Sequence, residues 1–568
     1  MMAALAWIPL PGSAAPTPAE PATNPFLAAE YNNQSHWNDA ATDSTEIAVP
    51  RGHYRVTPGS YDWIPSEALG IPAYSAMVAG REVHWFFAGS SLRKFVRGGE
   101  WLQEVDRRSI RQGLREGPWP SDALRAEQLE ALRERIAARD EQAVIDYLLA
   151  QPNRLVSAVE DQVAQGVLYS LLTADHGFIG ANARGLLRID QEDPADPLSR
   201  LREPLQVDLP DALFDDERVR THTIFQSDAV FGLGMTFNGF LVINTLGGSI
   251  ATLDRQSLQL IDVHRAGDLD EVFTNSFATS PETGGGAVYV ASNRRLYRLV
   301  VAADGQIQAD AAAGAWEAAY DRGERLPMGK IADGTGATPT LMGFGPGEDE
   351  LVVLTDGSRK MKLVAFWRNQ IPADAKPPEG AASYRIADQV EVDLGAEFDL
   401  VQSEQSVVTH GRHAFVLNAL PVQRPSPLPV KGSYARGLLA GFTRPLPRGI
   451  AMFRWDDEAH RWQSLRQRSD VATVATVPMI SGGSRMVIVN GTFGERLGEL
   501  YHLGFNLDDG QLVMSIASGA DPLFNGVFTG IKCDRDGSLM YTTLFGLLRM
   551  DVERMEQVPS PDPQMRKN

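Results

Sequence analysis

The stretch Leu241-Val242-Ile243-Asn244, followed after a short turn by Ile250-Ala251, decides how this chain folds. An apolar run that ends in Asn, a turn and a second apolar run is typical of two antiparallel strands joined by a tight connection. The neighbouring residues extend this pair to four short strands, at 230–237, 240–244, 250–253 and 258–263. One complete four-stranded unit is therefore visible in the sequence.

The same pattern recurs about seven times between residue 167 and the C-terminus. In the other copies the first run ends at Asn182, Asn293, Asp356, Asn418 and Asn490, and a degenerate copy covers 539–543. A spacing of roughly 40–60 residues is typical of β-propeller blades. We predict an all-β fold, a seven-bladed β-propeller with six or eight blades as alternatives, in which an N-terminal strand completes the last blade. The Asn residues are interpreted as turn residues that tolerate a positive φ.

The repeat divides the chain into three parts. Residues 1–31 are predicted to be a leader, because a short apolar start is followed by a Pro- and Ala-rich spacer. This favours export to the periplasm or the exterior, with a cytoplasmic tail as the alternative. Residues 32–165 are predicted to be an aromatic segment and a helical cap, with Ser121 as an N-cap and a second helix over 141–150. Residues 166–568 form the propeller.

Composition excludes several functional classes. The net charge of −19 argues against nucleic acid as a partner, because phosphate binding needs clustered Lys and Arg. The single cysteine, Cys533, excludes a disulfide, a Cys-pair zinc site and covalent haem c, and we expect it to be buried. Motifs for a nucleotide or a quinone cofactor are absent. No run is apolar for long enough to form a transmembrane segment, and no feature specifies an oligomeric state.

Residues 525–549 resemble a repeat of the strictosidine-synthase-like, gluconolactonase and paraoxonase propellers. The resemblance rests on Asn525-Gly526, on the Asp-Gly turn that follows, and on the strand after it. In some of those families the Asn at this position ligates an axial calcium ion. The resemblance therefore implies a Ca²⁺ site at Asn525 and at Asn275, the equivalent residue of another blade. Asp228 and Asp333, near inner-strand starts, are candidates to supply charge.

One predicted blade departs from the repeat. Between Asn418 and Gly449 the usual short turn is replaced by about 30 residues, and loops of this length in compact repeats are usually functional or disordered. We predict that the insertion, Leu420–Arg448, is a lid over the tunnel mouth, with a surface insertion as the alternative. The candidate substrate-binding residues are Tyr434, Arg436, Arg444 and Thr338, the last at the start of another blade.

These observations favour an enzyme that acts on a small organic molecule in the axial funnel. The substrates considered include hydrophobic molecules. Hydrolase or lyase chemistry is favoured over redox chemistry, and the alternative is a non-catalytic propeller that binds a protein or a polysaccharide. The sequence contains no serine-hydrolase elbow and no zinc-protease helix, so the catalytic residues stay unassigned. His176, His410 and His413 are expected at surface turns on the face opposite the inner-strand starts.

Overall fold

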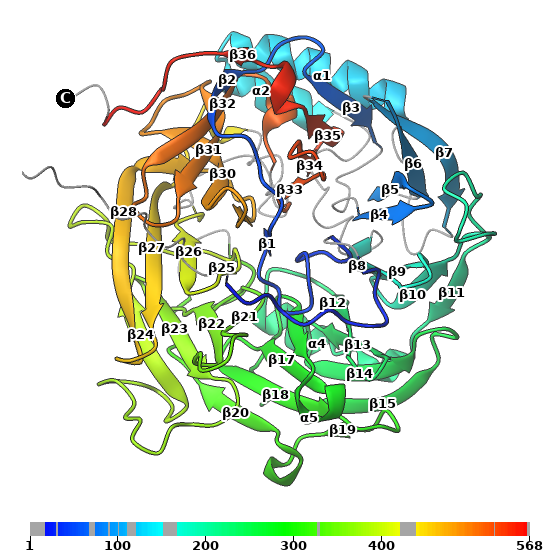
Figure 1. Cartoon of the computed structure of the whole chain (residues 1–568), viewed down its shortest axis with the longest axis vertical. Helices are drawn as coiled ribbons and strands as arrows, with labels where there is room; N and C mark the ends of the chain where they lie inside the picture. The colour runs from blue at the N-terminus through cyan, green and yellow to red at the C-terminus, as the bar shows by residue number, and fades with distance from the viewer. Residues whose placement is uncertain are drawn as a thin grey trace, which may run out of the picture.

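The chain forms a ring of antiparallel sheets around a central axis (Figure 1). The computed structural model describes residues 18–29, 32–66, 74–88, 91–99, 101–110, 121–150, 167–325, 330–420, 439–526 and 529–564. Six sheets are separate, and an eleven-stranded sheet contains two further four-stranded units. The prediction of a β-propeller is confirmed.

The first seven blades run in chain order from an inner strand to an outer one, and the last takes its outer strand from the N-terminal part of the chain. The first blade contains β4 (Tyr74–Val78), β5 (Arg81–Ala88), β6 (Ser91–Gly98) and β7 (Trp101–Ser109), and the second contains β8 (Val167–Leu172), β9 (Phe178–Asn182), β10 (Gly185–Ile189) and β11 (Leu205–Asp208). The third contains β12 (Val230–Met235), β13 (Phe240–Thr245), β14 (Ser249–Asp254) and β15 (Leu260–Arg265). The fourth contains β16 (Phe277–Ser280), β17 (Ala287–Ala291), β18 (Arg295–Val301), β19 (Ile307–Gln308) and β20 (Trp316–Ala319). The fifth blade contains β21 (Thr340–Met342), β22 (Leu351–Thr355), β23 (Lys362–Trp367) and β24 (Ile386–Glu391), and the sixth contains β25 (Val408–His410), β26 (His413–Leu417), β27 (Arg448–Asp456) and β28 (Arg461–Thr473). The seventh contains β29 (Met479–Ser481), β30 (Met486–Phe493), β31 (Leu500–Asn506) and β32 (Leu512–Gly519). The eighth contains β33 (Lys532–Cys533), β34 (Leu539–Thr543) and β35 (Gly546–Met550), and β3 (Tyr61–Pro65) joins it.

These sheets make eight blades, which is one of the alternatives to seven. The additional blade is β4–β7, in the aromatic segment that the sequence places over the ring. Its second strand, β5, ends in Phe86-Phe87-Ala88 and so lacks the terminal Asn or Asp that marks most of the other copies. The sixth and seventh blades merge into one sheet because the long strand β28 also pairs with β30, at Val471 and Phe493.

The ring is closed by strands from both ends of the chain, as predicted. The N-terminal β3 pairs with the C-terminal β35 and supplies the outer strand of the last blade, with Tyr61 opposite Met550. On the neighbouring blade, β2 (Gly52–Arg55) pairs with β32 and with β36 (Glu556–Gln557). The two ends of the chain thus complete the last two blades and hold the toroid closed.

The Asn residues that end the repeats do not serve as positive-φ turn residues, so that interpretation is wrong. None of Asn182, Asn244, Asn293, Asn418 and Asn490 has a positive φ. Instead the side-chain amides of several of them bridge neighbouring loops: Asn244 donates to the carbonyl oxygen of Asn275 at 3.2 Å, and Asn490 accepts from the Gly526 amide at 3.1 Å. Asn is favoured here because it can donate and accept at once.

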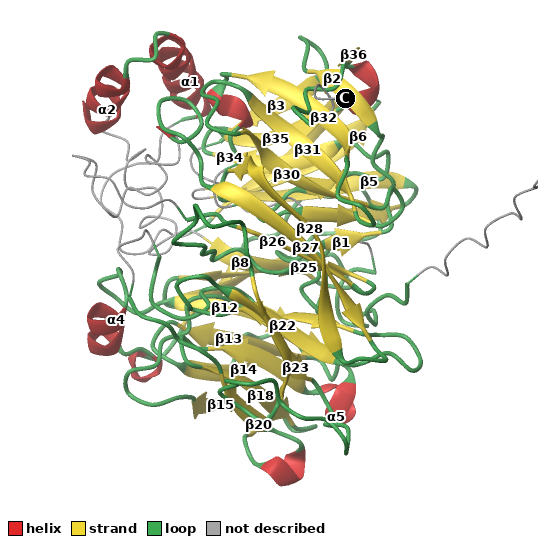
Figure 2. Ribbon diagram, turned by 90° about the vertical axis from the view of Figure 1, so that its left-hand side faces the viewer, coloured by secondary structure: helices red, strands yellow, loops and turns green. Residues whose placement is uncertain are grey.

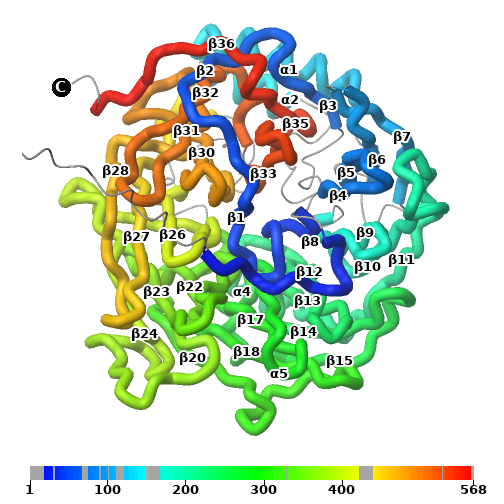
Figure 3. The backbone as a smooth tube through the Cα atoms, in the orientation of Figure 1, coloured from blue at the N-terminus to red at the C-terminus, as the bar shows by residue number. Residues whose placement is uncertain are grey.

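An N-terminal segment, dark blue in Figure 3, runs across the central opening. We call residues 24–45 the plug; it includes β1 (Ser44–Thr45), which pairs with β29. Backbone bonds join it to Leu172 of β8, Thr279 of β16, Leu341 of β21, Thr409 of β25 and Ile480 of β29. Side-chain bonds to β12 and β33 and a bridge from Asn32 to Ser75 of β4 complete the circle.

The helices lie mainly on one face of the ring (Figure 2). Both predicted cap helices are confirmed: α1 (Asp122–Ala137) begins after its N-cap Ser121, and α2 (Glu141–Ala150) follows it. Their buried faces pack on the seventh and eighth blades and on the end of the long insertion, at Leu439, Phe442 and Leu446. This face, where the inner strands begin, also carries α4 (Asp216–His222). A short α5 (Glu282–Gly285) lies on the other face.

Two sets of predictions fall outside the described residues. These are the apolar start of the leader and, within the insertion, Tyr434 and Arg436. Among the described residues, no helix combines the length and the apolar composition needed to cross a bilayer.

Candidate functional site

Two of the predicted site residues meet on the axis, at the face where the inner strands begin. Asn275 precedes β16 and Thr338 precedes β21, and the Thr338 hydroxyl donates to Oδ1 of Asn275 at 2.9 Å. The Tyr169 hydroxyl donates to the same oxygen, and the Asn275 amide donates to the carbonyl oxygen of Gly336 at 2.8 Å. Neighbouring blades therefore fix the orientation of the Asn275 side chain.

The plug adds a histidine and a carboxylate to this pair. His36 Nδ1 lies 2.9 Å from Oδ2 of Asp43, and its Nε2 lies 3.2 Å from the Thr338 hydroxyl. The His36 ring also stacks on Tyr169, with 6.2 Å between ring centroids. Carboxylate, imidazole and hydroxyl thus follow one another in the order used by acyl-transfer hydrolases. We call Asp43, His36, Thr338 and Asn275 the axial relay.

The donors and acceptors of His36 and Thr338 indicate how the axial relay can move a proton. When His36 carries a proton on both nitrogens, it donates to Asp43 and to Thr338, and Thr338 donates to Asn275. When only Nδ1 is protonated, Nε2 becomes an acceptor, and the Thr338 hydroxyl must choose between His36 and Asn275. The two states differ by one proton and one hydroxyl rotation.

The solvent exposure of the side chains in and beside the axial relay distinguishes the roles that they can take. Thr338 is fully buried, whereas the His36 side chain is 13% exposed and Asn275 and Tyr169 are partly exposed. A molecule that approaches from solvent therefore reaches the imidazole before it reaches the Thr338 hydroxyl. The geometry favours His36 as the group that exchanges protons and Thr338 as its hydrogen-bond partner.

A second titratable group borders the same mouth. Glu404 precedes β25, and its Oε1 accepts from the Ile331 amide at 2.8 Å. A Cβ at Gly336 would lie 2.7 Å from Cγ of Glu404, so this carboxyl packs against the loop that holds Asn275. Burial raises the pKa of Glu404 to about 7, although the nearby Lys330 opposes this rise. A carboxyl that exchanges its proton near neutral pH is suited to acid catalysis.

Lys532 lies between the plug and the last blade. Its ammonium donates to the carbonyl oxygens of Gln34 and Ser35, at 3.3 and 3.0 Å, and lies 4.7 Å from the centre of the Trp37 ring. Burial lowers the pKa of Lys532 to about 7, while Asp43 acts in the opposite direction. Because it contacts the backbone just before His36 and the Trp37 ring just after it, Lys532 fixes the path of the plug there.

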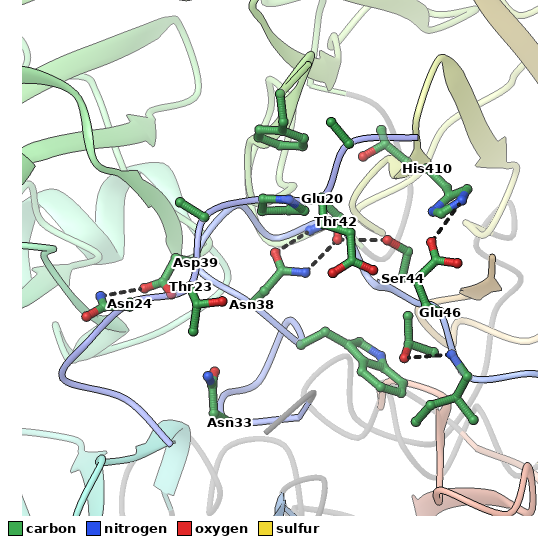
Figure 4. A pocket seen from close by; sticks show the side chains of 18 of the residues that line it. Glu20, Thr23, Asn24, Asn33, Asn38, Asp39, Thr42, Ser44, Glu46 and His410 are labelled. Atoms are coloured by element: carbon green, nitrogen blue, oxygen red, sulfur yellow. Dashed lines mark hydrogen bonds and ion pairs between the residues drawn. The ribbon is translucent and has the colours of Figure 1, made fainter. Parts of the chain in front are cut away.

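The opposite face of the plug carries a polar pocket of about 470 Å³ (Figure 4). Glu20, Asp39, Glu46 and His410 line it, together with several Asn and Thr side chains. His410 Nε2 lies 3.3 Å from Oε1 of Glu46, and the His410 side chain is 9% exposed, so it is not the surface residue that the sequence predicts. Burial raises the pKa of Glu20 and of Glu46 and lowers the pKa of His410.

The four residues proposed for calcium do not fit a shared ligand set. The Asp228 carboxylate accepts from the backbone amides of Asp215, Gly247 and Ala229, and Asp333 accepts from Asn293 and Arg322. Asn275 is engaged as described above, and the Asn525 amide lies 3.5 Å from the carbonyl oxygen of Ala440. Protein donors thus occupy the side-chain oxygens of Asn275, Asp228 and Asp333, and an axial calcium ion stays a prediction.

Arg444, a predicted substrate-binding residue, pairs instead with the cap. Its guanidinium donates to both carboxylate oxygens of Glu141, the first residue of α2, at 2.6–3.1 Å. This contact joins the end of the long insertion to the helices.

His36, Asp43 and Glu404 were not predicted from the sequence. Glu404 lies close to the repeat and could be found from its place before an inner strand. His36 and Asp43 lie in an irregular segment whose path depends on the completed tunnel.

Comparison with known proteins finds a distant relative. No family model matches this chain. A protein of Archaeoglobus fulgidus, described only as uncharacterized, is 29% identical over 330 residues, which cover 58% of this chain and 62% of the relative. This chain thus spans less than two thirds of the length of that relative.

Solved propellers resemble the chain at low identity. The WD40 domain of Sif2 is 8% identical with a TM-score of 0.39, over 91% of this chain and 98% of that one. The periplasmic gluconolactonase PpgL of Pseudomonas aeruginosa is 15% identical with a TM-score of 0.35, over 61% and 85%. BamB of Moraxella catarrhalis is 13% identical with a TM-score of 0.32, over 67% and 94%.

Proposed function

We propose that this propeller is a hydrolase for small organic molecules, with lactones and esters as the first substrate classes to examine. The single observation that carries the proposal is the Asp43–His36–Thr338 chain of hydrogen bonds on the axis. The local resemblance of residues 525–549 to gluconolactonase and paraoxonase propellers is the reason for choosing lactones and esters. Export from the cytoplasm stays part of the proposal and rests on the first residues alone.

In the proposed reaction His36 acts first as a base and then as an acid. It takes a proton from a water molecule, whose oxygen forms a bond with the substrate carbonyl carbon. The tetrahedral species collapses, the bond to the leaving oxygen breaks, and His36 returns its proton to that oxygen. Asp43 orients the ring and stabilises its positive charge during the step.

Glu404 is the proposed second acid at the mouth. Below about pH 7 it retains a proton that it can donate to an oxygen on the substrate as negative charge develops. The same pair of groups could serve a lyase, in which His36 removes a proton from carbon rather than from water. Formation of a hydroxy acid from a lactone, rather than an unsaturated acid, separates the two, because only hydrolysis adds water.

The experiment measures turnover of 4-nitrophenyl butyrate and of a set of five- and six-membered lactones. We expect His36→Ala to lower kcat/KM by about 100-fold or more, since general-base catalysis typically contributes 10²–10⁴-fold. His264→Ala, on the outer strand β15, is the matched control and should behave like the parent.

Loss of activity in His36→Ala with an unchanged thermal unfolding curve supports the proposal. Equal activity in the parent and His36→Ala would refute the role of His36. No turnover of any probe by the parent would instead favour the alternative, a non-catalytic propeller that binds a protein or a polysaccharide.

A further inference from the structure

A buried cluster of metal-ligating side chains joins the first blade to the last. Glu82 and His84 belong to β5, and Asp534 directly follows β33. In the described part of the chain, these three are the one group of three or more His, Cys, Asp or Glu residues with ligand atoms within 4.8 Å of one another. His84 and Asp534 are fully buried, and Glu82 is 7% exposed. We call these residues the seam cluster.

The sequence places two members of the seam cluster on one face of β5. Glu82 and His84 are two residues apart in β5, so both side chains point to the same side of the sheet. Phe86 follows on that face and packs with Phe95, Met540 and Leu547 across the two blades. A polar group in such surroundings is costly unless it has a partner, because little water reaches it.

Three atoms of the seam cluster have no hydrogen-bond partner among the described residues. They are Nδ1 and Nε2 of His84 and Oδ1 of Asp534. His84 Nε2 lies 3.8 Å from that Oδ1, which is too long for a hydrogen bond. Two ligands of a tetrahedral zinc ion are separated by roughly 3.4 Å, given bonds of about 2.0–2.1 Å. The observed gap therefore suits an intervening ion better than a direct contact.

Guanidinium groups hold the carboxylates around the seam cluster. The carboxylates of Glu82, Asp534 and Asp536 meet two guanidinium groups, those of Arg97 and Arg549. Arg549 lies 2.5 Å from Oδ2 of Asp534 and so leaves Oδ1 directed toward His84. A basic group that holds one oxygen of a ligating carboxylate is typical of the surroundings of metal sites.

We propose that the seam cluster binds one divalent transition-metal ion, of which zinc is the first choice. The ligands are Nε2 of His84, Oδ1 of Asp534 and a carboxylate oxygen of Glu82. An imidazole with two carboxylates favours zinc over calcium or magnesium, which prefer sites made of oxygen alone. Because its ligands come from the two blades that meet where the ring closes, the ion stabilises closure of the toroid. This site is separate from the axial calcium site that the resemblance implies.

A second histidine provides a matched control for this proposal. His502 on β31 is also fully buried, and neither of its ring nitrogens has a partner in the described structure. It packs on the Tyr541 ring at 4.9 Å, and it belongs to no metal-ligating group of described residues. Replacing His502 thus removes a buried imidazole without removing a ligand.

The experiment uses the full chain, treated with EDTA, dialysed, and loaded with Zn²⁺ or with Co²⁺. We expect one equivalent of zinc per chain to remain after gel filtration, and the cobalt form to show the visible absorption of a four-coordinate ion. Zinc should raise the melting temperature of the parent and of His502→Gln. His84→Gln and Glu82→Gln should each weaken zinc binding at least 100-fold and abolish the temperature shift.

The outcomes are decisive in both directions. Retention of zinc by the parent and by His502→Gln, with loss in the two cluster variants, supports the site. The proposal is overturned if the reloaded parent retains no metal, or if His84→Gln retains as much as His502→Gln. If His84→Gln does not fold, Glu82→Gln decides the question in the same way, because it keeps the size of the side chain.

Discussion

Replacing Asp39 by Asn should remove much of the pH dependence of the stability of the plug. Asp39 is 6% exposed, and its Oδ1 accepts from Asn24 and Thr279, both at 3.1 Å. Burial raises the pKa of Asp39 from 3.8 to about 7, against the effect of these hydrogen bonds. An Asn keeps the accepting oxygen and carries no charge, so the variant isolates the cost of ionisation.

The magnitude follows from proton linkage. Because the pKa of Asp39 is higher in the folded protein, folding binds a proton, and this stabilisation is complete below pH 3.8 and lost as the pH rises through 7. At 1.36 kcal/mol per pKa unit, the parent should lose roughly 3 kcal/mol of stability between pH 5 and pH 8 that Asp39→Asn does not lose.

The assay is equilibrium urea unfolding of the parent and Asp39→Asn at both pH values, followed by tryptophan fluorescence. The difference between the two pH dependences cancels every other titrating group. Asp304→Asn, on an exposed turn, controls for the change of charge. Parallel pH dependences for the parent and Asp39→Asn would refute the reasoning, because they would mean that the carboxyl ionises in the plug at no cost.

Three further substitutions test other parts of the structure. Glu404→Gln should remove a limb of the pH–rate profile near pH 7, because the raised pKa keeps this carboxyl protonated below that pH; an unchanged profile would exclude Glu404 as the acid. Arg444→Ala should cost no more than about 1 kcal/mol in urea unfolding, and less at high salt, since its pair with Glu141 is partly exposed. Gly334→Ala should cost at least about 2 kcal/mol, because φ is +80° and the new Cβ would lie 2.3 Å from the carbonyl oxygen of Asn293; a neutral result would contradict the close packing of the mouth loops.

The repeat predicts most of the fold because blades bury both faces of their central strands. The strand β22, for example, is buried along its whole length, so it appears in the sequence as a continuous apolar run. The eighth blade was missed because β5 does not end in Asn. That Asn marks a bridge between neighbouring loops and is not needed to form a blade.

The axial relay could be predicted only in part. Thr338 and Asn275 precede inner strands, and inner-strand starts converge in any propeller, so their meeting follows from the repeat. The path of the plug does not follow, because it depends on bonds to eight strands and on non-glycine residues with positive φ, Trp37, Ala41 and Asp43. Such conformations are unfavourable locally and are fixed only by the finished tunnel. Sequence patterns therefore gave no reason to place His36 on the axis.

The account depends most on the coupling of His36 and Asp43, and a double-mutant cycle in kcat/KM for the lactone and ester probes tests it directly. Residues that act as a unit have non-additive effects. We expect Asp43→Asn and His36→Ala each to reduce kcat/KM, and the double variant to be no slower than His36→Ala alone. Losses that multiply in the double variant, or full activity in either single variant, would contradict the axial relay.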